Sequence, residues 1–385
     1  MGDPSVVNWR LAPLTLRTNS QNEGPTAAQA PEATDAICDA MGVAAEIGQH
    51  ASAQFATISW RTGGRAHMDA DAADRGTRAR CVAPSAMGNS LQDERTKWVV
   101  ARFGAYMHYA VPRILQHAGR LERLYTDFYA GTVATHLLSL IPKRWRSSAI
   151  NRALGRSTPD LPLDRVWSYP LLGVEYYVRQ ARARDPEERS EVFLLTGSKF
   201  GKLVTRDGFG NARAVYGFNT AALEVLKAAK QRGLVTALEQ TIAPRALEEE
   251  LLTEEHRRFP GWEPTRVQGP STIKTIEREL AEWELADLIV CGSEFVRQGV
   301  GRCGGPMRKC LVVPYGVDAR FSRASRSSHN GPLRVLSVGE AGLRKGIPYA
   351  ADAARLLGDL AEFRWVGPVR LLPDARKYVE QFVQL

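Results

Sequence analysis

The chain lacks several features that would assign it to whole classes of protein. No apolar run reaches the roughly 18 to 20 residues that a membrane-spanning helix needs, and no basic segment followed by an apolar one marks a secretory signal at the N-terminus. None of the five cysteines forms a C-x-x-C pair or has a histidine nearby at zinc-ligand spacing. We therefore expect no bound metal, no cofactor, and a reducing, cytoplasmic location.

Residues 1–95 contain no lysine, and charge is unevenly distributed along the chain. The segment has eight Arg against eleven Asp and Glu, a net charge of −3, so the overall +9 leaves +12 for the remainder. A basic body suits nucleic acid, an anionic membrane surface or phosphorylated substrates. Because no helix-turn-helix, zinc-finger or aromatic RNA-binding pattern is found, we expect phosphorylated substrates, with peripheral contact at the inner membrane face, and no nucleic acid.

Residues 1–95 also have little apolar periodicity and are rich in Ala, Gly, Ser and Thr. We interpret them as a variable or disordered N-terminal extension. From residue 96 onward, strand-like and helix-like patterns alternate, which predicts an α/β fold of parallel sheets with helices on both faces. The expected organisation is a first Rossmann-like domain over residues 96–317, a hinge or linker over 318–332, and the start of a second domain over 333–385.

Apolar periodicity and capping residues give approximate bounds for these elements. The strands are expected at residues 98–103, 191–195, 212–218, 234–238, 287–291, 311–313, 333–338 and 363–366. The helices are expected at residues 106–118, 221–232, 244–257, 273–285, 294–299, 347–357 and 374–384. Asn219-Thr220 and Ser293 are expected to cap two of these helices.

The strongest candidate site is the loop between the strand ending at residue 338 and the helix beginning at residue 347. It contains Gly339, Gly342, Arg344, Lys345 and Gly346, at the end of a strand where open α/β sheets bind ligands. Arg344 can fork to phosphate oxygens, and Lys345 adds a point charge. Cations at a helix start oppose the helix dipole, which favours an anionic partner. The alternative is two solvated cations on an ordinary turn.

Residues 277–367 resemble the retaining glycosyltransferases of family 4. The likeness rests on three segments in the family's order and spacing: Asp287 to Val296, Val312 to Asp318 followed by Phe321, and Val338-Gly339 with Lys345-Gly346. The resemblance implies the GT-B fold, in which a first Rossmann-like domain binds the acceptor and a second binds a nucleotide-sugar. It also implies a transferase that moves a hexosyl or related group to a saccharide or lipid-linked acceptor. That transfer proceeds with retention and without metal, in polysaccharide biosynthesis.

The same resemblance implies roles for particular residues. Lys345 and Arg344 would bind the donor diphosphate within the loop of Gly339, Gly342 and Gly346. The acceptor side and cleft would contain Gly104, His108, Glu239 and Gln240, and the hinge would contain Tyr315, Gly316 and Asp318. Plainer alternatives are a surface turn for Gly104 and for Glu239 with Gln240, and a surface or partly buried histidine for His108.

Two family features have no counterpart here: an acidic motif with a glycine-rich stretch, and a final helix that packs back on the first domain. The acidic E-x7-E motif is missing after Gly367, so no catalytic residue is assigned, and the second domain is expected to be truncated, with a sheet of two strands. The alternative function is therefore a catalytically inactive, truncated glycosyltransferase that acts as a binding or interaction module. A basic nucleic-acid binder is the third, weaker hypothesis.

Overall fold

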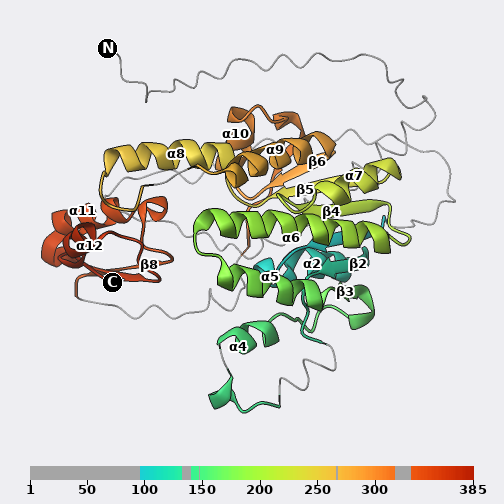
Figure 1. Cartoon of the computed structure of the whole chain (residues 1–385), viewed down its shortest axis with the longest axis horizontal. Helices are drawn as coiled ribbons and strands as arrows, with labels where there is room; N and C mark the ends of the chain where they lie inside the picture. Colours follow the sequence, from blue (N-terminus) through green and yellow to red (C-terminus); the bar gives the residue numbers. More distant parts are fainter. Residues whose placement is uncertain (1–95, 132–139, 147, 266–267, 317–330) are drawn as a thin grey trace, which may run out of the picture.

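The computed structural model of the 385-residue chain describes residues 96–131, 140–146, 148–265, 268–316 and 331–385 (Figure 1). The predictions for residues 1–95, Asp318, Phe321 and most of the 318–332 linker lie outside these residues. Within them the chain forms one parallel sheet of seven strands and one of three, which confirms the α/β fold class. None of the described helices is long and apolar enough to cross a bilayer.

The large sheet has the strand order β3-β2-β1-β4-β5-β6-β7, with every neighbouring pair parallel. Its strands are β1 Trp98–Arg102, β2 Leu121–Thr126, β3 Val166–Ser168, β4 Ala214–Phe218, β5 Val235–Gln240, β6 Leu288–Cys291 and β7 Cys310–Val312. The chain winds outward from β1 to β3 and then restarts at β4 on the other side of β1. The winding direction thus reverses between β1 and β4, the point at which open α/β sheets bind ligands.

Helices cover both faces of the large sheet. They are α2 Ala110–His117, α5 Pro170–Arg182, α6 Pro186–Asp207, α7 Leu223–Gln231, α9 Pro270–Leu285 and α10 Glu294–Arg302. On β1, Val100 packs in one core cluster with Leu115 of α2, whereas Val99 packs on the opposite face with Phe200 of α6 and Val225 of α7. Double-sided burial explains why the central strand β1 begins as a continuous apolar run, residues 98–101, rather than an alternating one.

The small sheet has the order β10-β9-β8, with strands β8 Leu333–Val338, β9 Ala361–Val366 and β10 Val383–Gln384. Helices α11 Ile347–Leu357 and α12 Pro373–Glu380 pack on it, and their Ile347 and Val379 share a core with Trp365. The prediction of two strands was wrong: the expected helix 374–384 ends at Glu380, and Val383 pairs with Phe363 of β9.

Helix α8, Arg245–Arg258, and the turn after it connect the two sheets (Figure 1). The Leu372 N–H donates to the Trp262 carbonyl at 2.8 Å, and the Tyr349 hydroxyl donates to Glu255 at 2.9 Å. The Phe259 ring also meets the Tyr349 ring edge-on at 5.3 Å. Within the described residues, these contacts hold the small sheet to α8 and the turn that follows it.

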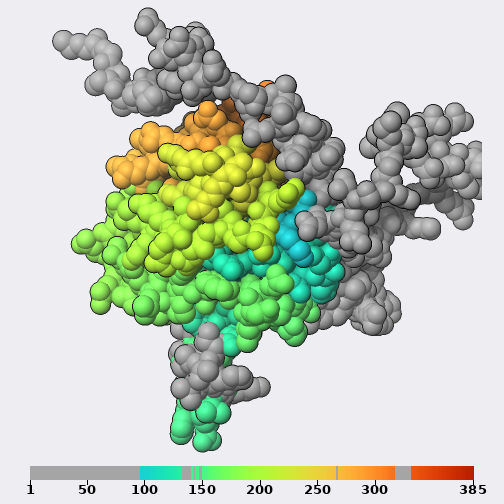
Figure 2. All heavy atoms as spheres, turned by 90° about the vertical axis from the view of Figure 1, so that its right-hand side faces the viewer, coloured from blue at the N-terminus to red at the C-terminus, as the bar shows by residue number. Residues whose placement is uncertain are grey.

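The remaining elements are short. They are α4 Ser148–Leu154 and the 3-10 turns η1 Tyr106–Tyr109, η2 Lys143–Trp145, η3 Leu163–Arg165, η4 Met307–Lys309, η6 Leu343–Lys345 and η7 Gly358–Leu360. Figure 2 shows the α4 segment projecting from the body of the molecule. Sequence periodicity did not predict β2, β3, α4 or α5, which lie mostly in a region broken by several prolines.

The strand expected at residues 191–195 was also wrong, because these residues lie inside α6. Asp185 caps this helix by accepting a hydrogen bond from the Glu188 N–H at 2.8 Å, and Pro186 occupies its first turn. Its buried residues include Leu194, Gly197, Phe200 and Val204, a helical spacing. Packing along 22 residues of helix overrides the local strand preference of Val-Phe-Leu-Leu.

Candidate functional site

Two glycines bring the ends of β8 and β9 together at the start of the predicted donor loop. Gly339 has φ 142°, and its N–H donates to the Val366 carbonyl at 2.9 Å. A Cβ on Gly367 would lie 1.9 Å from the Gly339 carbonyl oxygen, so no other residue fits there without a backbone shift. The Trp365 indole N–H donates to that same oxygen at 2.9 Å, which fixes the loop's first residue.

The middle of the loop is pressed against Glu263, which follows α8. The Leu343 N–H donates to Glu263 Oε1 at 2.6 Å, and a Cβ on Gly342 would lie 2.3 Å from that oxygen. Gly346 has φ 72°, a left-handed conformation that favours glycine, and directly precedes α11. Gly339 and Gly346 therefore have a conformational reason to be glycine, whereas a Cβ on Gly342 would meet only the tip of the flexible Glu263 side chain.

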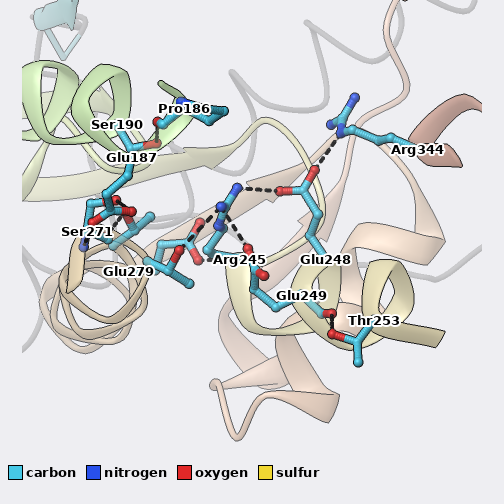
Figure 3. A network of polar contacts seen from close by, with 12 residues as sticks. Pro186, Glu187, Ser190, Arg245, Glu248, Glu249, Thr253, Ser271, Glu279 and Arg344 are labelled. Atoms are coloured by element: carbon cyan, nitrogen blue, oxygen red, sulfur yellow. Dashed lines mark hydrogen bonds and ion pairs between the residues drawn. The ribbon is translucent and has the colours of Figure 1, made fainter. Parts of the chain in front are cut away.

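The structure separates the two adjacent cations of this loop. Arg344 Nε donates to Glu248 Oε1 of α8 at 2.5 Å (Figure 3). Lys345 is exposed, and its Cε lies 3.9 Å from the position of a Cβ on Gly339, so the side chain folds back over the end of β8. Among the described residues, no acceptor binds the Lys345 ammonium. Lys345, rather than Arg344, is thus the cation available to an anion at this strand end.

Arg344 instead joins a polar network that spans α8 and α9. Glu248 also accepts from Arg245 Nη1 at 3.0 Å, and Arg245 Nη2 forms an ion pair with Glu249 at 2.7 Å. The Arg245 backbone N–H donates to Glu279 of α9 at 2.7 Å. Figure 3 shows Arg344 reaching Glu248 from a separate segment of chain. The network makes Arg344 part of the link between the two sheets.

On the large sheet, the loop after β1 is anchored to the end of β2. The Gly104 N–H donates to Asp127 Oδ1 at 2.9 Å, and Gly104 has φ 92° with nothing within 4 Å of a built Cβ. Asp127 is buried and also accepts from Arg156 Nη2 at 2.5 Å. Sequence analysis missed Asp127 and Arg156, since only the fold brings them beside Gly104.

The segment after Gly104 has an unusual backbone. Met107, His108 and Tyr109 have φ values of 49°, 47° and 60°, so three successive non-glycine residues are left-handed. The expected helix 106–118 therefore starts as a 3-10 turn, and α2 begins only at Ala110. His108 is exposed, whereas Tyr109 is buried and its hydroxyl donates to the Phe128 carbonyl at 3.1 Å. Such local strain concentrates at functional sites.

Glu239 and Gln240 do not form a surface turn. Glu239 is 3% exposed and accepts hydrogen bonds from the Tyr216 hydroxyl at 2.9 Å and the Tyr315 hydroxyl at 3.1 Å. Burial raises the pKa of Glu239, and the tyrosine hydrogen bonds and the nearby Arg102 oppose that rise. The structure therefore brings Tyr315, predicted for the hinge, against Glu239, predicted for the acceptor side.

The Gln240 side chain is hydrogen-bonded inside the protein. It is fully buried, its Nε2 donates to Glu279 Oε1 at 3.1 Å, and its Oε1 accepts from the Trp283 indole N–H at 2.9 Å. Its amide oxygen and nitrogen are thus both used inside the protein. Gly316, the other described hinge candidate, follows Tyr315 on the same segment.

Arg102, the last residue of β1, completes the cluster around Glu239 and was not singled out in the sequence. Its Cζ lies 4.1 Å from the centre of the Phe218 ring and 4.7 Å from that of the Tyr106 ring. Burial lowers the pKa of this guanidinium, and the charge of Glu239 opposes the change. The available sequence signal is a cation that ends a strand of otherwise apolar residues.

No protein-family model and no curated protein matches the chain. Solved structures that resemble it include Anabaena HepE in complex with UDP and glucose, with 12% identity over 74% of this chain and 64% of that chain, and a TM-score of 0.38. Another is an α,α-trehalose-phosphate synthase (UDP-forming) from Burkholderia vietnamiensis, with 11% identity, 74% and 66% coverage, and a TM-score of 0.36. The UDP-GlcNAc 2-epimerase from Neisseria meningitidis bound to UDP-GlcNAc has 13% identity, 75% and 71% coverage, and a TM-score of 0.35. The chain thus spans 64% to 71% of these proteins.

Proposed function

We propose that the chain is a GT-B glycosyltransferase related to family 4, which binds a nucleotide-sugar at the Gly339–Gly346 loop. The observation that carries this proposal is the position of Lys345, an exposed cation folded over the carboxyl end of β8 with no described acceptor. An ammonium there can bind a diphosphate and stabilise the negative charge that develops when the sugar–phosphate bond breaks. The proposed transfer proceeds with retention and needs no metal, as the family resemblance implies.

The acceptor is proposed to bind at the carboxyl edge of the large sheet, near Gly104, Tyr315 and Glu239. These residues follow or end β1, β7 and β5, and the β1–β4 reversal lies among them. The corresponding division of the chain is an acceptor domain over residues 96–317 and a donor domain from residue 333. The acceptor class is a saccharide or a lipid-linked acceptor.

A sugar-transfer assay tests this function against the interaction-module alternative. The intact chain is incubated with UDP-, GDP- and ADP-sugars and a panel of saccharide acceptors, and nucleoside diphosphate release is measured. Lys345→Ala is expected to lower the rate at least about tenfold, because a charge-assisted contact to the leaving group is lost. Lys377→Ala, which removes another exposed lysine of the same half, is the matched control. A folded chain without transfer activity on any donor would favour the interaction module.

We also propose that α5 contacts an anionic membrane surface. Leu171, Val174 and Val178 are 87%, 56% and 36% exposed and lie on one face of α5 at a helical spacing. Arg179 and Arg182 are exposed on the same helix. An apolar stripe beside cations fits the interface of a bilayer with anionic lipids, where a lipid-linked acceptor would be found.

A further inference from the structure

Arg102 stands at the point where the winding of the large sheet reverses. It is the last residue of β1, and Phe218, whose ring its guanidinium faces, is the last residue of the neighbouring strand β4. Gly104 follows two residues later, in a backbone conformation that leaves open space on its Cβ side. Arg102 therefore occupies the position at which an open α/β sheet meets its ligand.

The guanidinium of Arg102 has aromatic neighbours but no described hydrogen-bond acceptor. Its Nε is buried without a partner among the described residues, although part of the side chain remains exposed. A guanidinium that stacks on aromatic rings keeps its N–H groups free at its edge, where a planar or tetrahedral oxyanion can accept two of them. Buried charged donors are normally satisfied, so this one calls for a partner from outside the described protein.

The nearby carboxylates are engaged elsewhere. Glu239 accepts from Tyr216 and Tyr315, and Asp127 accepts from Gly104 and Arg156. No ion pair joins either of them to Arg102 within the described part of the chain. The left-handed residues 107–109 follow directly and hold Tyr106 over the guanidinium. The Arg102 guanidinium is thus held in place by aromatic rings, and its N–H groups have no acceptor among the described residues.

We propose that Arg102 binds an anionic group, a phosphate or a carboxylate, carried by the sugar or polyol acceptor. This inference rests on the proposed function, because it assigns the acceptor class to the acceptor edge of the same protein. Arg102 then selects phosphorylated or acidic acceptors over neutral ones. The contact involves no covalent step: the oxyanion accepts hydrogen bonds from the guanidinium edge.

The test measures binding of glucose 6-phosphate, glucuronate, inorganic phosphate and glucose by calorimetry. All titrations use a chain that carries Lys345→Ala, so that the proposed diphosphate site does not contribute. We expect the anionic probes to bind at least tenfold tighter than glucose. Arg102→Gln should abolish this preference. Arg102→Lys keeps a positive charge beside Glu239, so it serves as the test if the Gln variant fails to fold. It should weaken the preference about tenfold, because a lysine cannot donate the two parallel hydrogen bonds of a guanidinium.

Arg123→Gln is the matched control, since Arg123 lies on the neighbouring strand β2 and stacks on Trp167 at 3.8 Å. It should leave the preference for anions intact. Equal affinity for glucose and for the anionic probes, or unchanged anion binding in folded Arg102→Lys, would overturn the proposal. In parallel, UDP is titrated into the chain that retains Lys345. This titration reports on the donor site alone, so a failure of the proposed function can be distinguished from a failure of the Arg102 proposal.

Discussion

Arg344 and Lys345 are neighbours in the sequence but lie in different environments. From the sequence alone, both could bind a diphosphate, with Arg344 the better fork and Lys345 the better match to the family pattern. The structure directs Arg344 to Glu248 on α8 and leaves Lys345 over Gly339. Sequence could not separate the two roles, because Glu248 lies 96 residues away along the chain.

Sequence patterns also failed to identify Arg102, Asp127 and Arg156. Each belongs to a cluster whose members come from different strands or loops, so no local pattern marks them. Glu239 was predicted from its place at a strand end, but its burial and its contact with Tyr315 depend on β7 reaching the sheet edge. The sequence pattern could thus nominate candidate residues at strand ends, but it could not predict their long-range partners.

The buried carboxyl of Glu239 should make stability depend on pH. Its pKa is raised in the folded protein, mainly by burial, relative to about 4.3 in the unfolded chain. The stability it contributes is present below that value and lost as pH rises through the raised folded pKa. Tyr216 and Tyr315 donate to this carboxyl, and burial raises the pKa of both hydroxyls, so they stay neutral over that range; Arg102 is the nearby cation.

Glu239→Gln cannot ionise and should lack this contribution. The free energy of urea unfolding, measured from pH 5 to pH 8 for both proteins, should fall more with rising pH in the native chain than in the variant. Parallel pH profiles for the two proteins would show that the carboxyl does not titrate differently on folding, and would contradict the assignment.

Helix α7 depends on a side chain from another helix for its N-terminal cap. Its own N-cap, Ala222, offers no side-chain acceptor, and Asn219-Thr220 do not cap it as the sequence suggested. Instead, the buried Glu282 of α9 accepts from the N–H groups of Thr220, Ala222 and Leu223 at 2.6, 2.9 and 3.0 Å.

Glu282→Ala should therefore destabilise the protein by about 2–4 kcal/mol, because three N–H groups lose their acceptor in a buried site. Glu284→Ala, an exposed position on the same helix, should change the free energy of unfolding by less than about 0.5 kcal/mol. Both are measured by urea denaturation. If Glu282→Ala were as stable as Glu284→Ala, the result would contradict a capping role for Glu282.

The apolar stripe of α5 gives a separate prediction about membranes. Leu171→Ser combined with Val174→Ser should reduce co-sedimentation with vesicles that contain an anionic lipid, because apolar area leaves the interface. Leu356→Ser, on the exposed surface of α11 at 75% exposure, is the control and should bind as the native chain does. Native binding that is absent, or unchanged in the double variant, would refute the membrane contact.

Elements with a clear period were predicted well, and those with competing signals were not. Helix α11 occupies the expected residues 347–357, and Ser293 Oγ accepts from the Val296 N–H at 3.3 Å as the expected cap of α10. The error at residues 191–195 arose because a β-branched and aromatic run lies inside a long helix, where tertiary packing decides the outcome. Strands β2 and β3 were missed in a region of weak periodicity.

For the whole molecule, the alternation of strands and helices predicted the α/β class and the parallel sheets. It could not predict the strand order, the reversal between β1 and β4, or the bridging role of α8, since these depend on contacts across the chain. The two halves of the proposed site lie on separate sheets connected through α8, and Arg344 is part of that connection. Donor binding is therefore expected to depend on Lys345 and only weakly on Arg344.

The most direct test of the account is calorimetric titration of the chain with UDP, GDP, ADP and their common sugar conjugates. The account predicts that at least one binds, that Lys345→Ala weakens this binding at least about tenfold, and that Arg344→Ala changes it less than about threefold. Unchanged affinity in Lys345→Ala, or no binding by the folded chain, would contradict a donor site at the Gly339–Gly346 loop.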